Sequence, residues 1–86
     1  MLCEQIETKL LEVLDAFANQ LPRDDVSNIR ELVEAGEWGV GFEILCTQLY
    51  EYDVEIPRAL FHQLESIGHL MQMDKSTWCV LRDLLV

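Results

Sequence analysis

The sequence predicts an all-α protein, a single helical domain over residues 1–86 that forms a compact bundle of about five helices with short connections. Apolar residues recur every three or four positions in several segments, which is the spacing of amphipathic helices. No segment alternates polar and apolar residues over the length of a strand, and no Asn-Gly or Asp-Gly hairpin turn occurs. Half of the residues are hydrophobic, which is enough to order one core.

The first predicted helix runs from the start of the chain until residues 19–23 break the apolar pattern. Seven apolar residues form its inner stripe: Leu2, Ile6, Leu10, Val13, Leu14, Phe17 and Leu21. Pro22 ends it, because proline cannot continue a helix. A second helix is expected to begin near Asp24 and Asp25, whose carboxylates can accept hydrogen bonds from the free N–H groups of a first turn. Gly36 suits the left-handed position that ends such a helix.

The third predicted helix, from Trp38 to Tyr52, is the most apolar one and is therefore expected at the centre of the bundle. One face of it carries six apolar or aromatic residues: Trp38, Phe42, Leu45, Cys46, Leu49 and Tyr52. Gly39 and Gly41 are poor helix formers, so either another helix approaches closely at this point or the first turn is irregular.

Residues 53–57 predict a short extended connection, because Ile56 precedes a proline and is pushed away from helical geometry. Pro57 suits the first position of a fourth helix. The inner line of that helix has four members: Leu60, Leu64, Ile67 and Met71. Asp74 is expected to cap a short fifth helix. Four residues of this last helix are expected to face inward: Trp78, Leu81, Leu84 and Leu85.

The charge balance excludes several classes of partner. The chain has 16 acidic and 6 basic residues, a net charge of −10 and a pI of about 4.3. Nucleic acid requires a positive surface, so binding to nucleic acid is not expected. Anionic membrane surfaces are disfavoured for the same reason. Positively charged proteins remain as partners.

The cysteines and the N-terminus indicate a cytoplasmic protein. No basic stretch followed by an apolar run begins the chain, and no apolar run approaches the roughly 20 residues of a membrane span. The three cysteines are odd in number and far apart in the sequence, which fits a reducing compartment: Cys3, Cys46 and Cys79. Cys46 and Cys79 lie in apolar runs and are expected to be small buried side chains.

Most of the negative charge lies in residues 24–55, which we call the acidic block. It contains nine acids and a single base, Arg30, so it carries a net −8 of the total −10. One interpretation is a solvated face that keeps the protein soluble. The other is a docking surface for a basic partner, which the interleaved Trp38, Tyr50 and Tyr52 favour. Trp38 and Tyr52 also lie on the apolar stripe, so either can be a core residue.

No constellation typical of an enzyme is found, and no cofactor or metal is expected. His62, Glu65 and His69 share a helix face but span two turns, whereas paired histidines that chelate zinc lie one turn apart. Residues 50–53 offer tyrosines and carboxylates for acid–base work without a histidine or cysteine close by in the sequence. The glycines at 36, 39 and 41 follow a helix rather than a strand, so they form no phosphate loop.

Residues 31–54 read ELVEAGEWGVGFEILCTQLYEYDV. This run resembles the Maf-type family of small bacterial immunity proteins, in which a pattern ELxxAGE-G-A-E-LC-QLYEYD precedes an extended turn and another helix. The resemblance covers residues 26–81 and includes residues 64–68 and the segment around Trp78. Gly41 stands where the family pattern has alanine.

The resemblance implies a non-enzymatic inhibitor that binds the toxic C-terminal domain of a secreted toxin, as in contact-dependent growth inhibition. Such toxins are often nucleases, ribonucleases in particular, and a nuclease presents a basic cleft that an acidic protein can cover. Four positions are then expected in the core: Leu45, Cys46, Leu49 and Tyr50. The expected toxin contacts are exposed acids with two aromatic anchors: Glu34, Glu37, Trp38, Glu43, Glu51, Tyr52, Asp53 and Glu55.

The alternative function is a small helical protein–protein interaction or regulatory adaptor domain. Its distinguishing sign would be a well-formed homo-oligomer without a linked toxin gene. A homo-oligomer is compatible with either function, because the sequence does not reveal how much apolar surface is exposed.

Overall fold

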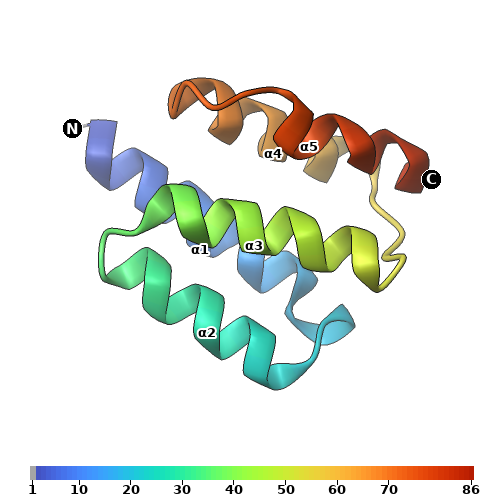
Figure 1. The fold of residues 1–86 in the computed structure, drawn as a ribbon, viewed down its shortest axis with the longest axis horizontal. Coiled ribbons are helices and arrows are strands. Elements are labelled where there is room, and N and C mark those ends of the chain that lie inside the picture. Colours follow the sequence, from blue (N-terminus) through green and yellow to red (C-terminus); the bar gives the residue numbers. More distant parts are fainter. Residues whose placement is uncertain (1) are drawn as a thin grey trace.

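The computed structural model describes residues 2–86, with side chains from Glu4 onward, and it confirms an all-α fold of five helices (Figure 1). The elements in chain order are α1 (Leu2–Phe17), a 3₁₀ turn η1 (Ala18–Gln20), α2 (Arg23–Glu34), α3 (Trp38–Glu51), α4 (Arg58–Leu70), α5 (Ser76–Cys79) and a second 3₁₀ segment η2 (Val80–Leu84). The predicted inward position of Leu2 and the predicted free state of Cys3 fall on side chains outside the described residues.

Successive helices run in alternating directions, as the short connections predict (Figure 1). The helices α2 and α3 form the tightest pair, and α1 packs against both of them and against α4. The short α5 and η2 lie beside α3 and close the bundle next to α4. The helix α4 therefore packs on α1 and α5, and the line along which α3 meets α5 is open to the surface.

The helix α2 begins near Asp24 and Asp25 as predicted, but the cap expected from their carboxylates is not formed. The helix begins at Arg23, directly after Pro22, and no side chain caps its first turn. Asp25 instead accepts a hydrogen bond from Gln48 on α3, with 3.0 Å between Nε2 and Oδ2. The carboxylate at this position therefore joins two helices, because the antiparallel arrangement brings the end of α3 next to the start of α2.

Two glycines make the α2–α3 hairpin possible. Gly36 has a φ of 86°, the left-handed conformation predicted for it, and the N–H of Glu37 donates to the carbonyl of Leu32 at 2.8 Å. A β-carbon at Gly41 would lie 2.9 Å from Cγ2 of Val33, so α2 approaches α3 closely at this glycine. Of the two sequence interpretations, the close approach is confirmed, and α3 is helical from Trp38 onward.

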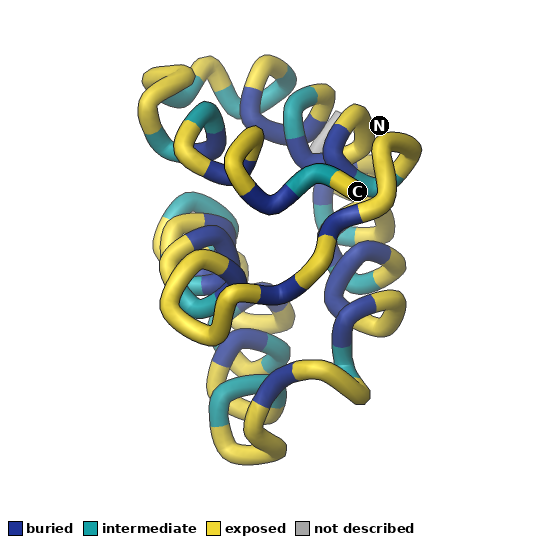
Figure 2. The backbone as a smooth tube through the Cα atoms, turned by 90° about the vertical axis from the view of Figure 1, so that its right-hand side faces the viewer, coloured by how far each residue is buried: buried dark blue, intermediate teal, exposed yellow. Residues whose placement is uncertain are grey.

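The core lies between the five helices, and buried residues face inward from each of them (Figure 2). None of the described polar or charged residues is buried. The predicted core members Leu45, Cys46 and Leu49 are confirmed as buried, and Phe42 of the same helix is buried with them. Twelve large side chains are fully buried: Trp78, Phe17, Phe42, Leu10, Leu14, Ile29, Leu45, Leu49, Ile56, Leu64, Ile67 and Leu81.

Several residues predicted to face the core are partly or fully exposed. Tyr50 is 45% exposed and Tyr52 is 51% exposed, so neither is a core residue. Tyr52 lies one residue beyond α3, where the chain turns away through Asp53 with a φ of 52°. Tyr50 lies on the flank of α3 that α5 and η2 cover incompletely. Five others are half-buried at the edge of the core: Trp38, Leu60, Met71, Cys79 and Leu85.

Backbone hydrogen bonds join the connection before α4 to the last residues of the chain. The N–H of Ile56 donates to the carbonyl of Leu84 at 2.9 Å, and the N–H of Val86 donates to the carbonyl of Ile56 at 3.2 Å. The extended connection thus lies beside the end of the chain and fixes η2 next to α3.

Asp74 caps α5 as predicted, since its Oδ1 accepts a hydrogen bond from the N–H of Ser76 at 2.8 Å.

Among the described helices, none combines the length and the apolar content that crossing a membrane requires.

Candidate functional site

Seven of the nine acids of the block lie at opposite ends of the α2–α3 hairpin, and the other two, Glu31 and Glu43, lie between these ends. The turn end carries Glu34, Glu37 and Trp38, where α2 passes into α3. The connection end carries five acids at the other tips of these helices and in the chain after α3: Asp24, Asp25, Glu51, Asp53 and Glu55. The 14 residues of α3 place about 20 Å between these two ends. A single run of acids in the sequence is therefore spread over both ends of the hairpin in space.

The acids of the block have no compensating bases. Arg30, the single base of the block, pairs with Asp15 on α1, an acid outside the block. Within the described part of the chain, no ion pair joins any of the nine acids to a lysine, arginine or histidine. Their carboxylates therefore keep their full attraction for a positive partner, apart from screening by salt.

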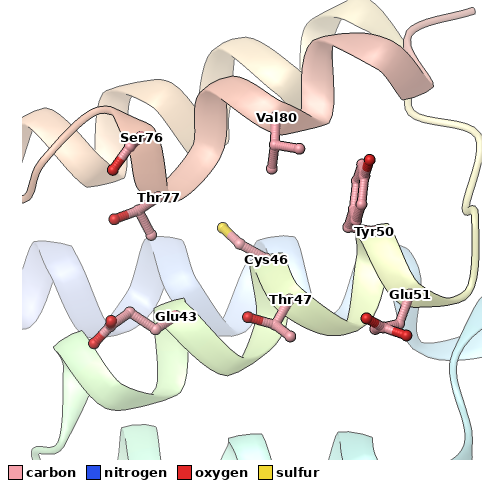
Figure 3. A pocket seen from close by; sticks show the side chains of 8 residues that line it. All are labelled: Glu43, Cys46, Thr47, Tyr50, Glu51, Ser76, Thr77 and Val80. Carbon is pink, nitrogen blue, oxygen red and sulfur yellow. The ribbon is translucent and has the colours of Figure 1, made fainter.

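A groove between α3 and α5 brings two of the predicted site residues to one place (Figure 3). This α3–α5 groove has a volume of about 360 Å³. Its lining comes from α3, α5 and the start of η2: Glu43, Cys46, Thr47, Tyr50, Glu51, Ser76, Thr77 and Val80. Glu43 and Glu51 are the two predicted contacts among them. They lie eight positions apart on one flank of α3.

Cys46 lies at the bottom of the groove and is only 2% exposed. Burial, and to a smaller extent the nearby Glu43 carboxylate, raises the pKa of this thiol to about 12. The thiol is therefore protonated at neutral pH, and a protonated thiol is a poor nucleophile. The groove consequently has a neutral, weakly polar floor between two carboxylates.

The walls of the groove expose apolar surface. Tyr50 on α3 is 45% exposed, and Val80 on the opposite wall is 39% exposed (Figure 3). The hydroxyl groups of Ser76 and Thr77 lie toward the end of the groove that holds Glu43 (Figure 3). Aromatic and aliphatic surface inside a charged rim is the arrangement found at protein interfaces.

The two predicted aromatic anchors differ in their environment. Trp38 is half-buried, and its Nε1 donates to Oε1 of Glu7 on α1 at 3.3 Å. This tryptophan holds α3 against α1, which accounts for its side chain without a partner. Tyr52 is exposed at the connection end, beside Glu51 and Asp53, where a partner can reach it.

Tyr50 was predicted in the core, and the residues of the opposite wall were not predicted as part of the site. The sequence does contain a sign that Tyr50 is exposed, because this residue lies off the main apolar stripe of α3. Ser76, Thr77 and Val80 come from a segment about thirty positions later, and no local pattern indicates that they lie opposite Glu43. Only the packing of α5 on α3 reveals them.

The outer face of α4 has a different character. Glu65 lies 3.6 Å from Nδ1 of His62 and 3.9 Å from Nη2 of Arg82, and the His69 ring stands edge-on to Trp78. Across the described residues, no group of three His, Cys, Asp or Glu side chains has the geometry of a metal site. His62 and Arg82 therefore both lie near the carboxylate of Glu65, on a part of the bundle distinct from the α3–α5 groove.

No known protein family, curated protein or solved structure matches this chain significantly.

Proposed function

We propose that this protein is an immunity protein that binds a basic toxin domain, in the first place a ribonuclease, and neutralises it without turnover. The observation that carries the proposal is the set of nine acids in the α2–α3 half whose carboxylates form no ion pair within the described residues. A nuclease needs a positive cleft to hold its phosphodiester substrate, and such a cleft is the natural counterpart of this surface.

Inhibition would be steric and electrostatic. The acidic surface steers association with the toxin, and once bound it covers the cleft or lies beside it and keeps RNA out. We assign the main contact to the connection end together with the α3–α5 groove. Exposed acids, the exposed Tyr52 ring and the apolar walls of the groove meet there. At the turn end, Trp38 is already engaged with Glu7.

The test is coexpression with the C-terminal domain of the large secreted protein encoded immediately upstream. We expect this chain to restore growth and to copurify with that domain as a stable complex. Toxicity that the chain fails to relieve, or the absence of any toxin-like neighbour, would overturn the proposal and favour a regulatory adaptor. Growth reports neutralisation and copurification reports binding, so the two readouts separate a weak complex from a wrong partner.

Charge reversal maps the contact. The pair Glu51→Lys and Glu55→Lys lies at the connection end, and the matched pair Glu34→Lys and Glu37→Lys makes the same change of net charge at the turn end. Asp53 is left unchanged because its φ of 52° would strain a lysine. The first pair is expected to slow association with the toxin by about tenfold at low ionic strength. Equal slowing by both pairs would contradict the assignment to the connection end.

A further inference from the structure

The α3–α5 groove has its two carboxylates at opposite ends, with Thr47 between them (Figure 3). Glu43 and Glu51 are separated by eight positions of regular helix, which is about 12 Å along the axis of α3. Thr47 lies midway on the same face of α3, Cys46 lies behind it, and Val80 faces this middle part from the opposite wall. The groove therefore has a carboxylate near each end and mixed polar and apolar surface between them.

No positive group from the described part of the chain lines the groove. Among the described residues that line it, none is lysine, arginine or histidine, and neither carboxylate belongs to an ion pair. The nearest bases along the sequence of the opposite wall, Lys75 and Arg82, line a different pocket together with Trp78 and His69. Both carboxylates are consequently available for cations from another molecule.

The spacing of the two carboxylates indicates the form of the occupant. The groove, of about 360 Å³, has room for a few side chains. Alternate side chains of an extended chain point to the same side, and residues i and i+4 lie about 13 Å apart. This spacing matches the separation of Glu43 and Glu51, and it places residue i+2 level with Thr47, opposite Val80.

We propose that the α3–α5 groove binds an extended basic segment of the partner protein. Cations at its positions i and i+4 pair with Glu43 and Glu51, and an aliphatic side chain at i+2 packs against Val80 on the opposite wall. Arginine suits both cationic positions, because its planar group donates two parallel hydrogen bonds to a carboxylate. The inference rests on the proposed function only for the source of this segment, the toxin domain.

Capped peptides test the groove without the toxin. The probe is acetyl-Arg-Gly-Leu-Gly-Arg-amide, titrated at low ionic strength into the ¹⁵N-labelled protein. A composition-matched peptide with adjacent arginines, acetyl-Arg-Arg-Gly-Leu-Gly-amide, serves as the spacing control. We expect the first peptide to shift the amide signals of Thr47, Tyr50, Thr77 and Val80 and to bind several-fold more tightly than the control.

Matched variants complete the test. Replacing both groove carboxylates, Glu43→Gln with Glu51→Gln, is expected to weaken binding of the spaced peptide about five- to tenfold. Replacing Glu34 and Glu37 by glutamine removes the same charge at the turn end and is expected to leave the affinity within about twofold. Equal affinities for the two peptides, or equal losses in the two double variants, would overturn the proposal.

Two further outcomes have a definite meaning. If the same four amide signals shift with protein concentration alone, a second copy of the chain occupies the groove and the proposal is wrong. If the spaced peptide binds as expected while coexpression shows no neutralisation, the groove specificity stands and the immunity function fails. If neutralisation succeeds and both glutamine pairs bind the toxin like the wild type, the immunity function stands and the groove assignment fails.

Discussion

The ring of Trp78 fills the space that Gly68 leaves open, because a β-carbon at position 68 would lie 2.2 Å from Cζ3 of the indole. Trp78 is 1% exposed and also packs against Phe42, with 6.3 Å between the ring centroids. One side chain of α5 thus holds this short helix against both α4 and α3. The wall of the α3–α5 groove depends on that contact, since α5 has only four residues of its own.

Gly68→Ala is expected to destabilise the protein by about 1–3 kcal/mol, because the new methyl group forces the rigid indole or the helix backbone to move. Gly39→Ala is the matched control, since a β-carbon there meets nothing within 4 Å. That substitution is expected to stabilise the protein by about 0.5–1 kcal/mol. Urea unfolding measures both changes, and an equal effect of the two alanines would contradict the packing of Trp78 on Gly68.

Cys46 is expected to resist alkylation in the folded protein. With a pKa raised to about 12 by burial and by Glu43, only about one molecule in ten thousand carries the thiolate at pH 8. Cys79 is half-buried and is expected to react faster with iodoacetamide than Cys46 does. Mass spectrometry of the digested protein measures each site, and labelling in concentrated guanidinium chloride shows that both thiols can react. Comparable rates at the two sites in the folded protein would contradict the burial of Cys46.

The same thiol predicts a loss of stability at alkaline pH. The folded-state pKa of Cys46, about 12, lies above its ordinary value of 9.0, so above pH 9 the folded protein binds more protons than the unfolded chain. The stabilisation by the protonated thiol is complete below pH 9 and is lost as the pH rises toward 12. Between about pH 8 and pH 10.5 the wild type should lose about 2 kcal/mol more than Cys46→Ala does. Parallel pH profiles of the two proteins would refute this.

The stabilisation that Asp74 gives as the cap of α5 is expected to be lost in acid, whereas that of Cys46 is lost in alkali. Asp74→Ala removes the acceptor of the Ser76 N–H and should lower the thermal midpoint by a few degrees. The backbone hydrogen bond from Ser76, followed by one from its side chain, lowers the pKa of Asp74 from its ordinary value of 3.8. Its stabilisation is therefore present above pH 3.8 and lost as the pH falls through the folded-state pKa.

Asp83→Ala is the control for this cap, because it removes an exposed acid of η2. Calorimetry at neutral and acidic pH should show the difference between wild type and Asp74→Ala shrinking in acid. A difference that persists at the lowest pH would mean that the carboxylate does not act as the cap.

Local signals in the sequence were sufficient for the helices and for most of their ends. The left-handed Gly36, the proline that precedes α4 and the capping Asp74 each act within three or four residues of their own position, so the sequence contains the whole interaction. The apolar period of three and four residues indicated the inner face of α3, and Leu45 and Leu49 are buried on it.

The site was predicted only in part, because periodicity reveals which face of a helix is apolar and not how completely its neighbours cover it. The sequence by itself determined the all-α class, the helix ends and the excess of acids in residues 24–55. Tertiary structure alone placed seven of these nine acids at two opposite ends of a hairpin and left Tyr50 exposed. It also placed Val80 opposite Glu43 and Glu51, because contacts between residues thirty positions apart depend on the packing of whole helices and not on any local pattern.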